Sequence, residues 1–291
     1  MDRRAFLKAM SVGLAGIAGT AFSATRLRAE EAGGHKEFMG VLVDTTRCIG
    51  CRSCEEACAE ANNLPVPDIS DESVLGKRRD TSVTQFTVIN RYTTEKGNVF
   101  VKKQCMHCCQ PGCVAACLVN AMQKREEGPV TWDTNCMGCR YCMVSCPFDI
   151  PKFEYNSWNP RIQKCNLCWD RIKAGKQPAC VEACPQEALL FGRRKELLVV
   201  AKRRIYQKHK KYIQHVYGEH EVGGTDWLYI SAVPFEQIGL RTDLGTTAYP
   251  EFTTGFLYAV PIVLLLWPAF LMGVSYITKR EEEEEMRGGT R

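Results

Sequence analysis

The sequence has 291 residues, enough for one large domain or two ordinary ones. Its formal net charge of +5 at pH 7 is too small to indicate a nucleic-acid-binding protein. The 17 cysteines make up about 6% of the chain, which is below the proportion that marks a small disulfide scaffold. The function of the cysteines must therefore be inferred from their spacing.

Residues 1–29 have the features of a targeting segment. A twin-arginine pattern, Arg3-Arg4, comes first, and an uncharged stretch rich in Ala and Gly follows it. This stretch is too short and too weakly apolar to be a membrane span. Cleavage after Ser23 and cleavage after Ala29 both fit. We expect this segment to be a twin-arginine signal peptide, which exports a chain that has already folded.

Four groups of four cysteines follow, and each contains C-x2-C and ends with C-x3-C. The third group reads C-x2-C-x2-C-x3-C-P, the bacterial-ferredoxin spacing, in which three thiolates bind one [4Fe–4S] cluster and the fourth binds a neighbouring cluster. The first group has the same spacing, whereas the middle gap holds four residues in the second group and eleven in the fourth. The groups are Cys48, Cys51, Cys54 and Cys58; Cys105, Cys108, Cys113 and Cys117; Cys136, Cys139, Cys142 and Cys146; and Cys165, Cys168, Cys180 and Cys184.

Because a ferredoxin motif gives its fourth thiolate to a second cluster, the motifs must work in pairs. Only a short predicted hairpin separates the second and third motifs. We therefore expect these two to form an inner module, nested inside an outer module made by the first and fourth. The predicted ligand sets are set 1, Cys48, Cys51, Cys54 and Cys184; set 2, Cys165, Cys168, Cys180 and Cys58; set 3, Cys105, Cys108, Cys113 and Cys146; and set 4, Cys136, Cys139, Cys142 and Cys117.

Cys109 remains outside the four sets. C-x2-C from Cys105 to Cys108 matches the other three motifs, whereas C-x3-C to Cys109 matches none of them. We expect Cys109 to be a small packed thiol, as free buried cysteines usually are.

Disulfides and zinc sites are two other uses of cysteine. An exported protein can hold disulfides, and paired C-x2-C units can bind zinc through four thiolates. Neither use requires the trailing C-x3-C-P, so the spacing favours iron–sulfur clusters. Basic residues near the motifs would raise the potential of anionic clusters, although an ordinary solvated surface is the expectation for any single one. They are Arg52, Lys102, Lys103, Arg140, Lys164, Arg171 and Lys173.

Residues 30–250 are predicted to form one α+β domain that contains both ferredoxin-like modules. β-type residues with turn chemistry between them predict a hairpin inserted between the first two motifs, and a shorter one between the second and third. A surface helix is expected within residues 193–216 from its apolar spacing. The predicted strands are Phe38–Asp44, Gln85–Tyr92, Val99–Lys103, Ala121–Arg125, Pro129–Trp132, Ala188–Phe191 (ended by Gly192) and Trp227–Val233, and Glu55–Ala61 is a predicted helical turn.

Residues 251–278 are predicted to cross a membrane as one helix. Gly255–Ile277 is a run of 23 residues without a charge, and at about 1.5 Å per residue it would span roughly 30 Å of hydrocarbon. Pro261 and Pro268 would free backbone groups that neighbouring helices can satisfy, which hints at a membrane partner. Lys and Arg just after the span favour a cytoplasmic C-terminus, so residues 279–291 would be an acidic cytoplasmic tail.

The cysteine motifs and the residues around them resemble those of HybA-type iron–sulfur subunits of periplasm-facing [NiFe]-hydrogenases. They are also similar to the β subunits of respiratory formate dehydrogenases and other molybdopterin oxidoreductases. Ala59 and Leu118 depart from the pattern, because a proline is usual after the fourth cysteine. The stretches that carry the resemblance are Lys103–Cys108 with Pro111–Cys113, Gly138–Lys152, Lys164–Cys168 and Pro178–Pro185.

The resemblance implies a non-catalytic subunit that relays electrons through four [4Fe–4S] clusters. Its partners would be the small and large subunits of a hydrogenase, and a quinone-linked membrane subunit of the NrfD/HybB kind or a b-type cytochrome. A chain with its own twin-arginine signal and a C-terminal anchor favours the HybA type, with a formate dehydrogenase β subunit as the alternative. No catalytic constellation and no nucleic-acid partner are expected. The chain would lie at the periplasmic face of the inner membrane.

Overall fold

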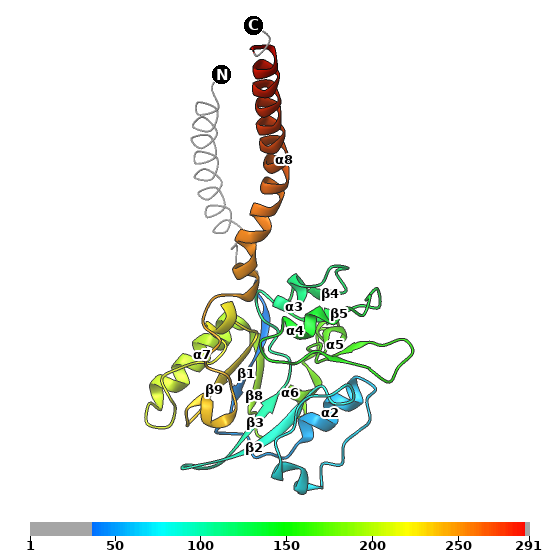
Figure 1. The fold of residues 1–291 in the computed structure, drawn as a ribbon. Helices are drawn as coiled ribbons and strands as arrows, with labels where there is room; N and C mark the ends of the chain where they lie inside the picture. The colour runs from blue at the N-terminus through cyan, green and yellow to red at the C-terminus, as the bar shows by residue number, and fades with distance from the viewer. Residues whose placement is uncertain (1–36, 289–291) are drawn as a thin grey trace. The chain divides into compact units, whose positions relative to one another are not determined.

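The computed structural model describes residues 37–288. The chain divides into two compact units, and Glu37–Phe252 forms one of them, which we call the body. The other unit includes the C-terminal helix from Thr253 onward. Figure 1 shows short strands and short helices throughout the body, with long connections between them. The predicted signal peptide lies outside the described residues.

A three-stranded sheet lies at the centre of the body, in the order β8-β1-β9. The middle strand, β1 (Met39–Asp44), pairs antiparallel with β8 (Leu189–Arg193) and parallel with β9 (Trp227–Ile230). Val41 and Leu42 of β1 and every residue of β9 are buried. This sheet ties together segments that are almost 190 residues apart along the chain.

One face of the sheet is covered by α7 (Arg194–Gln207), which packs through Leu197, Ala201 and Ile205 against Leu42 and Leu228. The apolar spacing in residues 193–216 therefore marks the buried side of this helix, and the rest of the helix is mostly solvated. The prediction that Gly192 ends the preceding strand is wrong. β8 continues through Gly192 to Arg193, because Gly192 pairs with Gly40 of β1.

Three two-stranded sheets complete the β structure of the body. They are β2 (Val88–Thr94) with β3 (Gly97–Lys103), β4 (Met122–Lys124) with β5 (Val130–Trp132), and β6 (Lys152–Phe153) with β7 (Ile162–Gln163), all antiparallel. The turn between β2 and β3 leads into Gly97, whose φ of 99° suits glycine.

The remaining helices of the body are short. The α-helices are α2 (Ser53–Ala61), α3 (Gly112–Ala115), α4 (Tyr141–Val144), α5 (Trp169–Lys173) and α6 (Ala179–Glu182), and the 3-10 helices are η1 (Glu72–Gly76), η2 (Glu221–Gly223) and η3 (Phe235–Ile238). Such short helices have little stability of their own, so the packing around the cysteine motifs must hold them.

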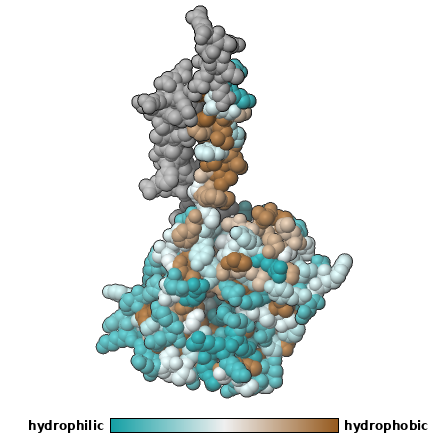
Figure 2. Space-filling view, in the orientation of Figure 1, coloured by the Kyte–Doolittle hydropathy of each residue, from teal (hydrophilic) through white to brown (hydrophobic). Residues whose placement is uncertain are grey.

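The helix α8 runs over Tyr249–Gly288. Within residues 37–288, it is the one helix long and apolar enough to cross a membrane, over Tyr249–Arg280. Its apolar side chains are exposed, as the brown surface in Figure 2 shows. Pro261 and Pro268 both lie inside it. The predicted span is thus helical, and the helix continues into the charged tail.

Candidate iron–sulfur centre

All four cysteine motifs have the same local fold. In each, the third cysteine is the second residue of a short helix: Cys54 in α2, Cys113 in α3, Cys142 in α4 and Cys180 in α6. The helix directs the fourth cysteine, four residues later, away from the first two. One motif therefore contributes to two places in the body, as the ferredoxin spacing requires.

The residue just before the second cysteine of each motif has a left-handed backbone. The φ angles are 76° at Gly50, 48° at His107, 73° at Gly138 and 56° at Leu167. In two motifs this conformation turns an N–H toward the first cysteine, since Gly138 N lies 3.4 Å from Cys136 Sγ and Leu167 N lies 3.4 Å from Cys165 Sγ. Such N–H groups stabilise thiolates and tune iron–sulfur clusters.

The residue that caps each motif helix alternates along the chain. Arg52 and Arg140 precede the helices of the first and third motifs, and both have a left-handed backbone. Pro111 and Pro178 precede the helices of the second and fourth motifs. The extended backbone of these prolines starts a helix without needing an N–H donor.

Set 1 and set 3 each line a cavity. Val43, Ile89 and Lys102 also line the cavity of set 1, and Met106, Val130 and Lys164 that of set 3. The four thiols of each set come from two motifs that are distant in the sequence. The first cavity contains Cys48, Cys51, Cys54 and Cys184, and the second contains Cys105, Cys108, Cys113 and Cys146.

The thiols of sets 2 and 4 are also brought together. Burial raises the pKa of the Cys58 thiol, and the nearby thiols of set 2, Cys165, Cys180 and Cys168, raise it further. Burial raises the pKa of Cys142 to about 11, with Cys136, Cys117 and Cys139 of set 4 adding to the effect. Metal coordination overcomes such an effect, because the thiolate is the form that binds a metal.

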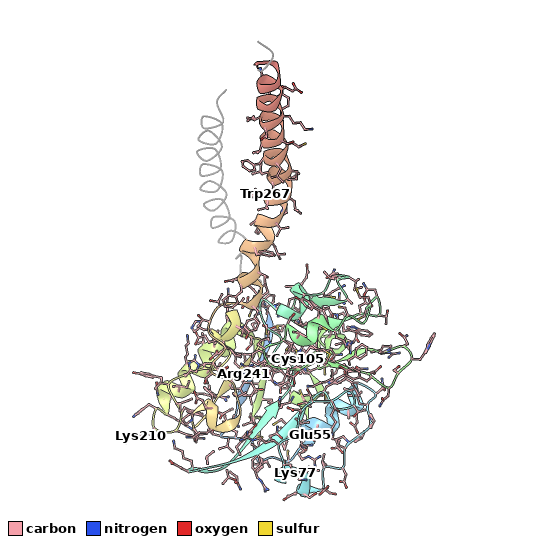
Figure 3. All side chains as sticks on the ribbon, viewed as in Figure 1. Glu55, Lys77, Cys105, Lys210, Arg241 and Trp267 are labelled. Carbon is pink, nitrogen blue, oxygen red and sulfur yellow. The ribbon has the colours of Figure 1, made fainter. Side chains whose placement is uncertain are left out.

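The four sets follow one another in space. Cys54 of set 1 neighbours Cys180 of set 2, Cys165 of set 2 neighbours Cys105 of set 3, and Cys113 of set 3 neighbours Cys142 of set 4. Figure 3 labels Cys105 in the interior of the body. The exposed thiols are those of the two end sets, Cys51 in set 1 and Cys139 in set 4.

A [4Fe–4S] cluster binds one thiolate at each of its irons, so it needs four thiols spaced around a cavity. The cavities of sets 1 and 3, lined by four thiols each and otherwise mainly apolar, therefore fit such a cluster.

His107 is a functional candidate that sequence reasoning missed. Its side chain is fully buried, and Nδ1 accepts a hydrogen bond of 2.8 Å from Val130 N. Burial lowers the pKa of His107 well below its usual value, and the positive charges of Lys164 and Lys124 lower it further. The neutral ring must carry its proton on Nε2, and this N–H has no protein acceptor within the described chain. A cluster sulfur would satisfy it.

The expectation of solvated surface positions for single basic residues is wrong for three of them. Arg52, Lys102 and Lys164 are only 3%, 2% and 5% exposed. Arg52 is bonded to the buried carboxylate of Glu55 at 3.2 Å. The two lysines line the cavities of set 1 and set 3. The sequence could not reveal this, because a lysine in a strand or before a cysteine reads as a surface residue.

Comparison with known proteins agrees with this centre. A family model described as a 4Fe-4S dicluster domain matches residues 97–194. The Hydrogenase-2 operon protein HybA of Escherichia coli O157:H7 is 34% identical over 99% of this chain and 98% of its own length. The chain belongs to the HybA family.

Two further relatives of this HybA-family chain are similar to it over most of its length. A protein of Nitratidesulfovibrio vulgaris (strain Hildenborough) is 50% identical over 97% of this chain and 78% of its own length. The nitrate-inducible formate dehydrogenase iron-sulfur subunit of Escherichia coli K12 is 37% identical over 67% of this chain and 69% of its own. The HybA-family chain is an iron–sulfur electron-transfer subunit of the ferredoxin type.

Proposed function

We propose that this chain relays electrons one at a time, through four [4Fe–4S] clusters, between a periplasmic [NiFe]-hydrogenase and a quinone-linked membrane subunit. The observation that carries the proposal is the succession of four cysteine sets with an exposed thiol at each end. Buried sets with exposed ends suit a relay between two partners, since electrons must enter and leave near the surface.

The sixteen cysteines of sets 1 to 4 would hold the clusters, one set for each. When bound, the clusters supply one-electron redox chemistry. The chain contributes burial, N–H groups directed at thiols such as that of Gly138, and positive charge. Sets 1 and 2 would form the outer module, and sets 3 and 4 the inner module nested within residues 30–250.

The membrane partner would bind at the end of the body that holds set 4. The motif helix α4 exposes Tyr141 and Val144 there, and Leu118, just after Cys117, is exposed as well. Gly112 of α3 lies beside Tyr249 at the start of α8, since a Cβ atom at Gly112 would stand 3.4 Å from the Cβ of Tyr249. An exposed apolar surface at this end of the body suits a partner embedded in the membrane.

The hydrogenase assignment rests on the HybA relatives and on the sequence of residues 1–29. The E. coli relative is a hydrogenase-2 operon protein, and the twin-arginine pattern would take the chain to the periplasmic face of the inner membrane. Residues 251–278 would anchor it there, with the tail 279–291 in the cytoplasm. The partners would be the small and large hydrogenase subunits, and a NrfD/HybB-like subunit or a b-type cytochrome.

A formate dehydrogenase is the second candidate partner, because its iron–sulfur subunit is 37% identical over two thirds of this chain. The decisive experiment is purification of the detergent-solubilised complex, followed by metal analysis. We expect about sixteen iron and sixteen sulfide for each chain, together with nickel. Molybdenum or tungsten in place of nickel would assign the chain to a formate dehydrogenase type. About twelve iron would contradict the proposal of four clusters.

A further inference from the structure

Lys102 is a buried cation without an anionic partner among the described residues. It is 2% exposed, and its Nζ atom donates to two neutral oxygens, Thr87 Oγ1 at 2.6 Å and Gln104 Oε1 at 3.3 Å. The same ammonium lies 4.6 Å from the centre of the Trp227 ring. A buried ammonium needs a compensating negative charge, because desolvation disfavours an unpaired charge inside a protein.

The buried carboxylate of Glu55 is already neutralised by other residues. Glu55 lies beside Cys54, and its oxygens bond Arg52 at 3.2 Å and Arg79 at 3.1 Å, while Ile89 N donates to it at 2.6 Å. Two arginines therefore share this one acid. No acidic residue in residues 37–288 forms an ion pair with Lys102. The compensating negative charge must therefore come from a group other than a carboxylate.

The groups that surround Lys102 are thiols of two different sets. Lys102 lines the cavity of set 1. Its neighbours also include thiols of both sets, namely Cys54 of set 1 and Cys58, Cys165 and Cys180 of set 2.

We propose that Lys102 is a positioned, unneutralised positive charge that raises the reduction potentials of the two clusters held by sets 1 and 2. The inference rests on the proposed four-cluster function. Each cluster gains one unit of negative charge when it accepts an electron, so a nearby cation in a dry site favours the reduced form. Because Lys102 lies beside both sets, its charge favours the reduced form of both clusters.

Lys164 has the same relationship to set 3. It is 5% exposed, its Nζ atom donates only to the carbonyl oxygens of Val130 and Cys165, and it lines the cavity of set 3. Its charge opposes the rise of pKa at Cys113 and Cys146. A Lys164 variant can therefore be compared with the Lys102 variant, because removal of the Lys164 charge would affect the cluster of set 3.

The test is an EPR-monitored redox titration of the purified complex with Lys102→Met. We expect two of the four midpoint potentials to fall by at least about 59 mV. This shift corresponds to a tenfold change in the reduced-to-oxidised ratio of a one-electron couple. The other two potentials should stay unchanged. Lys102→Arg, which keeps the charge, should lie close to wild type. Lys164→Met should lower a midpoint that Lys102→Met leaves in place.

Lys103→Met is the matched control. Lys103 is the next residue in β3, its side chain is 38% exposed, and it pairs with Asp80, so water and this carboxylate already screen its charge. Its loss should leave all four potentials unchanged. Four unchanged potentials in Lys102→Met with sixteen iron would overturn the proposal. Fewer than four clusters in the wild type would instead contradict the proposed function, whatever Lys102 does.

A second variant covers the case in which Lys102→Met does not assemble. Gln104→Glu keeps Lys102 and places a carboxylate where the Gln104 Oε1 oxygen stands, 3.3 Å from the ammonium. Gln104 Nε2 donates to Tyr229 OH at 2.6 Å, and this hydroxyl, which donates to the Lys102 carbonyl oxygen, would turn to donate to the new carboxylate instead. The same two potentials should fall. Unchanged potentials in Gln104→Glu would overturn the proposal.

Discussion

The Sγ atom of Cys109 lies 3.8 Å from Oδ1 of Asp226. Burial raises the pKa of this thiol to about 11, and the Asp226 carboxylate contributes to the rise. The neighbouring Cys108 instead lines the cavity of set 3 with Cys105 and Cys113. The two adjacent thiols therefore have different surroundings, and only Cys108 is placed with the other members of a set.

Cys109→Ala should keep all four clusters and full electron transfer, while Cys108→Ala should lose or convert one cluster. The reason is that alanine at position 109 removes only a packed thiol, whereas alanine at position 108 removes a proposed ligand. Iron content and EPR of the two variants measure the difference. Loss of a cluster from the Cys109 variant alone would mean that the register of the second motif is wrong.

Asp226 should make the stability of the body depend on pH. Its carboxylate is fully buried and 2.6 Å from Lys124 Nζ. Burial outweighs the nearby positive charges and raises its pKa from 3.8 to about 6. The folded chain therefore binds more protons than the unfolded chain between these values, and ionisation of Asp226 removes stability as the pH rises through this window.

Asn at position 226 cannot ionise. As the pH rises from 5 to 7.5, Asp226→Asn should therefore become more stable relative to wild type. Only part of the pKa shift of Asp226 takes effect between pH 5 and pH 7.5, and that part is worth about one pKa unit. The stability difference between variant and wild type should therefore grow by about 1.4 kcal/mol over this pH range. The measurement is the temperature at which each variant unfolds and loses its cluster absorbance, at both pH values. Wild type and variant carry the same clusters, so loss of the clusters in acid should affect both equally and cancel in the comparison. Parallel pH profiles would show that Asp226 does not titrate as proposed.

Gly50→Ala should be more damaging than Gly138→Ala, although the two glycines occupy equivalent positions with φ of 76° and 73°. Both variants force alanine into a left-handed backbone, at a cost of roughly 1–2 kcal/mol. A Cβ at Gly50 would also stand 2.5 Å from the Phe100 ring, whereas at Gly138 the nearest atom is 3.8 Å away. Overpacking should add about 1–3 kcal/mol at Gly50 alone.

Iron content after expression and the temperature of absorbance loss would measure this pair of variants. We expect Gly138→Ala to assemble with a small decrease in stability. The Gly50 variant should lose more stability and, at its limit, the cluster of set 1. Equal losses in both would mean that the Phe100 ring moves aside without cost.

Replacement of Arg3 and Arg4 by lysine should leave the chain in the cytoplasm. The twin-arginine route reads this pair as an address and exports chains that have already folded. Cell fractionation with an antibody against the body would locate the variant. Normal accumulation at the periplasmic face would mean that a partner subunit carries the export signal for this chain.

The cysteine spacing predicted where the motif helices begin, because the ferredoxin pattern places a helix after the second cysteine of each motif. Cys54, Cys113, Cys142 and Cys180 all lie at the start of such a helix. The apolar runs also predicted the strands β1 and β9, since short apolar segments are typical of buried strands. The parallel pairing between these two strands was not predictable, because it depends on packing between distant segments.

The left-handed backbone of His107 and Leu167 was also hidden in the sequence. Gly50 and Gly138 could indicate a left-handed position, since glycine adopts it freely. Histidine and leucine give no such signal, and Leu167 holds φ of 56° while its side chain is buried. The burial of Lys102 and Lys164 was missed for a related reason. A lysine is a surface residue unless some charge inside the protein compensates it.

The helix caps Arg52, Pro111, Arg140 and Pro178 alternate along the chain, and this alternation has a counterpart in the proposed modules. Each module combines one arginine-capped motif with one proline-capped motif, because the first motif pairs with the fourth and the second with the third. The outer module then takes its two motifs from opposite ends of the body. Neither half of the body could bind its clusters alone, so the body would have to fold as one unit.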